Sequence, residues 1–329
     1  MNSTRHKTNK LTAAIGLLVI CSSMLVACGG DSSDTTAGIG GTGIVSGQIT
    51  GFGSIHVNGG KFETDTSRFD VDGDTSADQS DLAVGMVVRL RVEVENGVFG
   101  STALEVVYDD EIEGPVSAVG VQVGTTKDIT VFGKIITIDE ISTLFENTNF
   151  NDIAIGDVIE VSGFRVSTTQ INATYVKETV EDVVYGSTEV ELRGTIDQYV
   201  MGGTTFEIDG TLINFDPTGM TTEIEVPGGI DNGLYVEVEG VIQTPASVFA
   251  EEIEQDDEDF DDDIDKISLE GVVSGFNDID SDFYVGSQRV NASNAELNPG
   301  GLILANGLNV EVEGQVTGGL LIADEVEEE

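Results

Sequence analysis

One pattern of apolar and polar residues occurs four times along the chain. Its clearest copy is NGLYVEVEG at residues 232–240, and looser copies lie at residues 84–92, 155–163 and 306–314. In each copy the residues three and five positions after a glycine are apolar, as Val236 and Val238 are, and a charged residue separates them. Side chains of a strand alternate between its two faces. The pattern therefore predicts a strand with an apolar face in a core and a charged face toward solvent.

These strands mark four similar units that follow one another in the chain. We place the units at residues 44–113, 114–189, 190–265 and 266–329. Each unit opens on a predicted strand that contains a glycine, and a recurring alanine follows the long strand: Ala103, Ala173, Ala250 and Ala323. The spacing of these markers changes by only a few residues between copies, which is typical of an internal repeat. At about 75 residues, each unit can bury a small core of its own.

The order of elements within a unit indicates the fold. In the first unit we expect strands at residues 46–50, 54–57, 61–63, 68–71, 86–94 and 103–108, with a short helical turn at Asp81–Val84. An Asn-Gly turn at residues 58–59 favours a hairpin between two of them. This order predicts an all-β protein of four tandem, OB-like small barrels. The alternative is a set of small open β-sandwiches, since the alternation alone does not distinguish the two.

Several segments resemble the bacterial domain-of-unknown-function family 5666. They are GSIHVNG at residues 53–59, FDVDG at 69–73, DLAVGMVV at 81–88 and EGP at 113–115. The resemblance is expected to be closest in the first unit and to extend into the second, whereas the other two keep only the core of the recurring strand. It implies a secreted lipoprotein with repeated small β domains, and it implies no catalytic residue.

The first 27 residues have the features of a signal peptide. Arg5, Lys7 and Lys10 precede an apolar stretch that is too short for a comfortable membrane span. The following LVAC at residues 25–28 resembles the lipobox of bacterial lipoproteins, which implies lipid on Cys28 and, because Gly29 follows it, sorting to the outer membrane. The alternative is an ordinary secretory signal cleaved near Ala27. Residues 28–43 are small and polar, and we expect them to form a flexible tether.

Charge and composition restrict the class of function. The chain has 14 Lys and Arg residues against 60 Asp and Glu residues, for a formal net charge of −46. Nucleic acid is therefore excluded as a partner, because phosphate binding needs a basic surface. Beyond the signal peptide the chain has one histidine, His56, and no second cysteine beside Cys28. A catalytic arrangement that depends on histidine or a free thiol is not expected, nor is a zinc site.

One acidic loop matches the spacing of a calcium-binding loop. Carboxylates stand at positions 1, 3, 5, 9 and 12 of a twelve-residue window: Asp70, Asp72, Asp74, Asp78 and Asp81. This spacing resembles that of EF-hands and dockerins, and it makes calcium the candidate metal. The loop departs from that pattern because Thr75 stands where glycine is needed and strands are expected on both sides. The alternative is a plain acidic hairpin loop.

In a second acidic segment, residues 251–265, most residues are Asp or Glu. A block of like charges predicts an extended linker, with weak binding of divalent cations as the alternative. The linker would allow the third and fourth units to move relative to each other.

The sequence thus favours a non-enzymatic, membrane-anchored protein of the cell envelope that binds an envelope protein or glycan, or acts as a spacer. The alternative is a carboxylate-dependent hydrolase of polysaccharide in the periplasm or at the cell surface. The absence of Trp from the chain argues against that alternative, since sugar-binding platforms need exposed aromatic rings.

Overall fold

The computed structural model describes residues 41–256, 260 and 264–329. The predicted signal peptide, Cys28 and most of the predicted tether lie outside these described residues. The described part of the chain is all-β, with 24 strands and one short 3₁₀ helix. None of its helices has the length and apolar character needed to cross a membrane.

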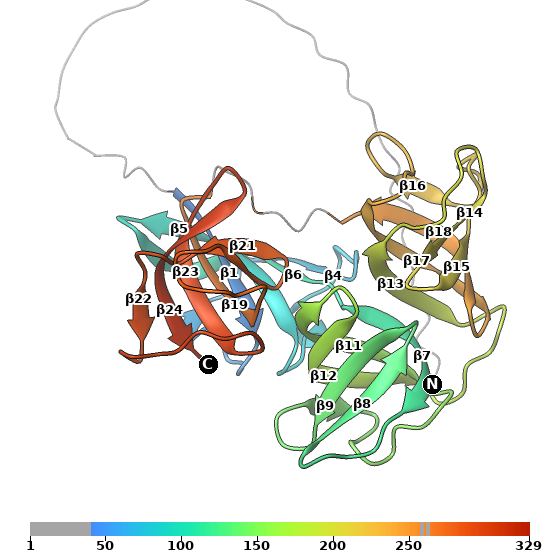
Figure 1. Cartoon of the computed structure of the whole chain (residues 1–329), viewed down its shortest axis with the longest axis horizontal. Coiled ribbons are helices and arrows are strands. Elements are labelled where there is room, and N and C mark those ends of the chain that lie inside the picture. Colours follow the sequence, from blue (N-terminus) through green and yellow to red (C-terminus); the bar gives the residue numbers. More distant parts are fainter. Residues whose placement is uncertain (1–40, 257–259, 261–263) are drawn as a thin grey trace, which may run out of the picture.

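Four units of six strands follow one another (Figure 1). Unit 1 contains β1 (Gly41–Gln48), β2 (Ile55–Val57), β3 (Gly60–Phe62), β4 (Arg68–Val71), the 3₁₀ helix η1 (Gln79–Asp81), β5 (Val87–Glu95) and β6 (Val98–Tyr108). Unit 2 contains β7 (Ile112–Val119), β8 (Thr126–Val131), β9 (Lys134–Asp139), β10 (Leu144–Glu146), β11 (Val158–Ser167) and β12 (Gln170–Val180). Unit 3 contains β13 (Glu189–Thr195), β14 (Thr205–Ile208), β15 (Thr211–Asn214), β16 (Glu223–Glu225), β17 (Tyr235–Thr244) and β18 (Ser247–Gln255). Unit 4 contains β19 (Lys266–Ser274), β20 (Phe283–Val285), β21 (Gln288–Asn291), β22 (Glu296–Asn298), β23 (Asn309–Thr317) and β24 (Leu320–Glu328).

Units 2 and 4 close into small barrels with the strand order of an OB-fold; unit 3 has the same order with an isolated bridge from Asp197 to Glu207, and in unit 1 β2 and β3 form a separate two-stranded sheet. In unit 2, β7 pairs antiparallel with β8 and β8 with β9, and β9 then runs parallel to β12. The barrel closes through β11, which pairs antiparallel with both β12 and β7. Unit 4 repeats this order with β19, β20, β21, β24 and β23. The OB-like fold is thereby confirmed, since an open sandwich would not join its first strand to both neighbours.

The recurring pattern forms the long strands β5, β11, β17 and β23, and its apolar residues lie in the cores. Near the middle of β17, Gly240 lies opposite Ala250 at an irregularity of the ladder. A Cβ on Gly240 would lie 2.1 Å from the carbonyl oxygen of Phe249, so only glycine fits this bulge. Units 2 and 4 repeat the pair with Ala173 and Ala323, which explains the recurring alanine of the sequence.

Two predicted boundaries need correction. Strand β1 begins at Gly41, so residues 41–43 are not part of a tether; their backbone pairs with residues 92–94 of β5. Residues 251–255 are not linker either, because they continue β18. Ile253 is fully buried and pairs with Val238 of β17, and this core contact holds the acidic residues around it in a strand.

The units join in pairs through their opening strands, an arrangement that the sequence did not predict. Strand β1 runs parallel to β19, which links unit 1 to unit 4, and β7 runs antiparallel to β13, which links unit 2 to unit 3. The result is one ten-stranded and one twelve-stranded sheet. In Figure 1, β1 and β19 accordingly lie side by side although far apart in sequence. Ile44 of β1 is buried in the core of unit 4, and one core cluster spans units 2 and 3.

Units 1 and 2 also contact each other. Tyr175 of β12 packs in the core of unit 1, and the hydroxyl of Tyr108 at the end of β6 donates to Glu160 of β11 at 3.1 Å. The two paired assemblies are therefore held against one another.

Candidate functional site

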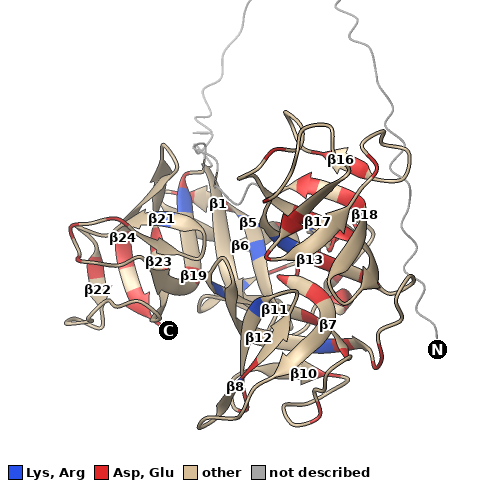
Figure 2. Cartoon of the chain, turned by 45° about the vertical axis from the view of Figure 1, so that its right-hand side comes forward, with Lys and Arg blue, Asp and Glu red and all other residues tan. Residues whose placement is uncertain are grey.

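The packing of the four units leaves a cavity of about 1690 Å³ that residues of every unit line. Its walls are dominated by carboxylates, which come from all four units; examples are Asp72, Glu160, Glu239 and Glu270. Figure 2 shows red acidic stretches recurring along β17 and β18, with few blue basic residues in the same region. The cavity therefore presents a strongly acidic concave surface.

A row of glutamates crosses the twelve-stranded sheet along one wall of the cavity. Glu113 of β7 lies opposite Glu160 of β11 on one side and Glu191 of β13 on the other. The row continues from Glu191 to Glu239 of β17, then to Glu252 of β18 and Glu223 of β16. It is continuous across the two units because β7 and β13 pair directly. Like charges placed directly opposite in a sheet repel, so this wall favours a positively charged neighbour.

Two basic residues offset part of this charge. Lys177 of β12 forms an ion pair with Glu160 at 2.8 Å. Arg193 of β13 is buried and pairs with Glu191 at 3.1 Å and with Glu237 at 2.7 Å. Burial alone lowers the pKa of Arg193, but the carboxylates of Glu191 and Glu237 outweigh it and raise that pKa well above its usual value. Arg193 therefore stays charged.

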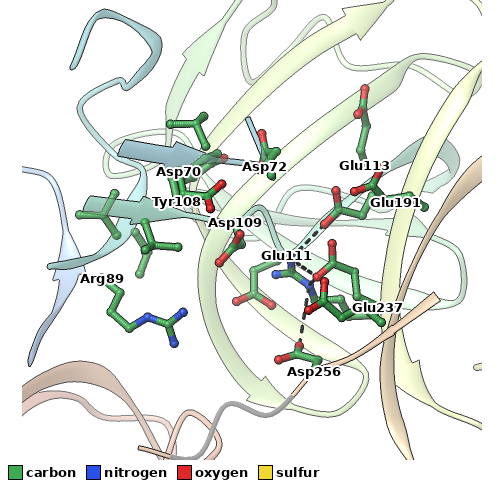
Figure 3. A pocket seen from close by; sticks show the side chains of 18 of the residues that line it. Asp70, Asp72, Arg89, Tyr108, Asp109, Glu111, Glu113, Glu191, Glu237 and Asp256 are labelled. Atoms are coloured by element: carbon green, nitrogen blue, oxygen red, sulfur yellow. Dashed lines mark hydrogen bonds and ion pairs between the residues drawn. The ribbon is translucent and has the colours of Figure 1, made fainter. Parts of the chain in front are cut away.

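Three carboxylates from different elements meet at Glu191, in the middle of the row. Asp72 follows β4, Asp110 lies between β6 and β7, and Glu191 belongs to β13. One oxygen of each lies within 4.8 Å of the others. Asp110 and Glu191 are buried, and burial, together with carboxylates around them, raises the pKa of both well above the usual range of a carboxyl group. Figure 3 shows Asp72 and Glu191 facing this part of the cavity.

The structure does not gather the five carboxylates of the predicted calcium loop. Among the described residues, no three of them come close enough to share an ion, and only Asp72 belongs to a cluster. Asp74 accepts a hydrogen bond from the backbone N–H of Ser76 at 2.8 Å, and Asp78 accepts one from Ser80 at 2.7 Å. Asp81 accepts from the backbone N–H of Asp78 at 2.8 Å, which completes a capping box on η1. These side chains hold successive turns, and Asp70 lies in β4.

Two further expectations concern single residues. His56 lies in β2 opposite Lys61 of β3, half-buried, as expected for an ordinary strand residue. Glu237 was expected on a solvent-facing surface, but it accepts two hydrogen bonds from Arg193 in the cavity wall. The reason is that the outer faces of the barrels become the walls of the cavity when the units pair.

Sequence reasoning missed Asp110, Glu191 and Arg193. Glu191 and Arg193 flank Leu192 in the opening strand of unit 3, where the alternation gives no sign that the charged face is covered. Asp110 lies in a short connection whose acidity is ordinary in this chain. Only the pairing of β7 with β13 makes these residues neighbours.

A comparison with protein-family models matched the domain of unknown function DUF5666 at residues 113–177, 193–254 and 270–327. The chain belongs to this family. The matched ranges are units 2, 3 and 4, which corrects the expectation that the resemblance is closest in unit 1. Each DUF5666 match begins in or next to an opening strand and extends into the last strand of its barrel.

Other comparisons add little to the DUF5666 assignment. A search of curated proteins found no match. Among solved structures, one titled "drosophila Unr CSD456" matches with 11% identity and a TM-score of 0.19, over 65% of this chain and 98% of the other. At that TM-score the likeness carries no argument about this protein.

Proposed function

We propose that this protein is a non-enzymatic, lipid-anchored binding protein of the cell envelope, and that its acidic cavity receives a positively charged segment of an envelope partner. The observation that carries the proposal is the row of glutamates along the cavity wall. Seven neighbouring strands, in the order β12, β11, β7, β13, β17, β18 and β16, each contribute one residue to the row. Lys177 of β12 stands at one end, and six glutamates follow it. Such a surface attracts cations and repels phosphate-bearing polymers.

The size of the cavity favours a segment of a macromolecule over a small ligand. Small-molecule sites usually measure roughly 300–1,000 Å³, whereas this cavity measures about 1690 Å³. A lysine- or arginine-bearing loop or tail would fill it and place several positive groups along the row. Electrostatic complementarity of this kind speeds association and selects the partner.

The anchor is proposed from the sequence alone. The lipobox-like LVAC at residues 25–28 supports lipid on Cys28, and Gly29 after it supports the outer membrane as the location. The barrels would then face the periplasm or the cell surface. In this position the protein meets envelope proteins rather than nucleic acid.

The test uses a short lysine-rich peptide as the probe and a glutamate-rich peptide as its control. We expect the full chain to bind the lysine-rich peptide, less strongly as salt is raised, and to leave it chemically unchanged. Glu239→Gln combined with Glu252→Gln removes two charges from the row and should weaken binding about tenfold. Fluorescence anisotropy measures the affinity.

The matched control is Glu93→Gln combined with Glu95→Gln, which removes two charges from exposed positions of β5. It should change the affinity less than about twofold, because screening weakens the influence of exposed, distant charges. Equal losses in the two variants would show that binding follows net charge and would overturn the proposed role of the cavity. Cleavage of a polysaccharide that depends on the same glutamates would favour a hydrolase instead.

A further inference from the structure

We propose that Asp72, Asp110 and Glu191 form a calcium site at the junction of units 1, 2 and 3. The site differs from the loop that the sequence suggested, because it shares only Asp72 with it. It shares Glu191 with the middle of the glutamate row, but a single ion there does not depend on the proposed positively charged partner.

The donor set and its geometry fit a hard cation. All three ligands are carboxylates, and calcium in proteins is bound by oxygen at about 2.3–2.6 Å. Two oxygens on opposite sides of such an ion are then roughly 4.6–5.2 Å apart, and other pairs of ligands lie closer together. The three oxygens lie within 4.8 Å of one another. The arrangement therefore leaves room for one ion without a rearrangement of the backbone.

An independent observation points to a ligand at this place. The side chain of Asp110 is 1% exposed, and its Oδ1 atom has no hydrogen-bond partner among the described residues. A buried carboxylate oxygen without a partner is costly, because the group has lost its hydration. Asp110 belongs to the three-carboxylate cluster, so a cation there would supply the interaction that its side chain lacks.

Backbone contacts hold the ligands in position. Asp72 has a positive φ of 46°, and its backbone N–H donates to the carbonyl oxygen of Tyr108 at 2.8 Å. The backbone N–H of Asp110 donates to Oδ1 of Asp72 at 3.1 Å. These contacts fix Asp72 against the connection between units 1 and 2, while β13 presents Glu191 from unit 3.

Two other carboxylate clusters are less suited to an ion. Glu191, Glu237 and Glu239 also lie close together, but Arg193 already occupies the space beside Glu191 and Glu237. The cluster of Glu225, Glu252 and Glu254 contains no buried member, so water competes for its oxygens. Arg193 also pairs with Glu191 in the proposed site. It pairs with one carboxylate of the proposed site and with two of the rejected cluster, and its charge reduces the repulsion among the three ligands.

Isothermal titration calorimetry of the full chain with calcium tests the proposal. We expect binding with a Kd of roughly 0.1–1 mM, the range of extracellular sites, and much weaker binding of magnesium, which gives up its water reluctantly. Asp110→Asn should weaken calcium binding at least about tenfold. Asp78→Asn is the matched control, since it removes the same charge from the sequence-predicted loop, and it should leave calcium binding unchanged.

Several outcomes would overturn the proposal. They are unchanged calcium binding by Asp110→Asn, loss of binding in Asp78→Asn, and equal effects of calcium, magnesium and sodium at matched ionic strength.

Asp110→Asn removes a buried charge, so without calcium its thermal unfolding should begin at a temperature no lower than that of the parent protein. If that variant does not fold, Glu191→Gln takes its place with the same expected loss. The peptide probe is absent from this experiment, so its result is independent of the proposed partner binding.

Discussion

At the scale of single residues, some charged positions of the recurring strand are partly buried in the structure, although the alternation predicted that they face solvent. Glu311 of β23 shows this best. It lies opposite Glu327 of β24 and accepts a hydrogen bond from the Ser268 hydroxyl at 2.6 Å. Burial raises its pKa from 4.5 to about 7; the Ser268 hydrogen bond opposes this rise, and Glu313 and other glutamates add to it. A carboxyl group that is harder to ionise in the folded protein stabilises the fold when protonated.

The resulting prediction concerns stability against pH. The contribution of Glu311 is complete below pH 4.5 and is lost as the pH rises toward about 7. Glu311→Gln mimics the protonated form, so above pH 7 it should raise the free energy of unfolding by about 1–2 kcal/mol, a value reduced for partial solvent exposure. Below pH 4.5 the substitution should change the free energy of unfolding little. Urea unfolding at both ends of the range measures the difference. Glu95→Gln, at an exposed position of β5, should show no such dependence, and a similar gain in it would contradict the assignment.

At the scale of elements, the register of the long strand decides which substitutions the fold tolerates. Val238 of β17 is fully buried in the core cluster that units 2 and 3 share. Val238→Asp should therefore lower the free energy of unfolding by at least about 3 kcal/mol, because the carboxylate would be buried without a partner. Circular dichroism during thermal unfolding should show the loss in both units. Gln243→Asp adds the same charge at an exposed position of the same strand and should cost less than about 0.5 kcal/mol. Equal damage by the two substitutions would show that the register is wrong.

The elements also show what the sequence can and cannot predict. Alternation is a local property, so it predicted the long strands and their buried valines, and the order of strands predicted the OB-like barrel. The pairing of β7 with β13 joins the edges of two different barrels, so no local pattern of residues predicts it. Asp110 and Glu191 are distant in sequence, and each resembles many other carboxylates of this acidic chain. Their convergence was therefore not predictable, whereas the regular spacing of Asp70 to Asp81 suggested a site that the structure does not assemble.

At the scale of the whole molecule, unit 4 is held by unit 1 rather than by the unit that precedes it in the chain. The parallel ladder between β1 and β19, Ile44 in the core of unit 4, and a hydrogen bond from the Gln48 backbone to Glu270 at 2.9 Å make this contact. A protease site inserted within residues 257–263 tests it. After cleavage, the two fragments should still elute together in size-exclusion chromatography, because the contact does not depend on chain continuity.

Ile44→Asp provides the comparison for that experiment. It places a charge in the core of unit 4, so the cleaved fragments of this variant should separate. Separation of the fragments without the substitution would instead support the earlier expectation that units 3 and 4 move independently.

The continuous glutamate row has a consequence for how such a protein can change by duplication. Four of the six glutamates, Glu191, Glu239, Glu252 and Glu223, belong to unit 3, and the other two belong to unit 2. Neither copy carries the wall by itself, because the seam between β7 and β13 creates it. A gene that lost unit 3 would therefore encode a protein with only two of the six glutamates, whereas one that lost unit 2 would keep four, and in both cases the row would no longer cross from one unit to the next. Copy number is in this sense a determinant of binding, in addition to the residues within each copy.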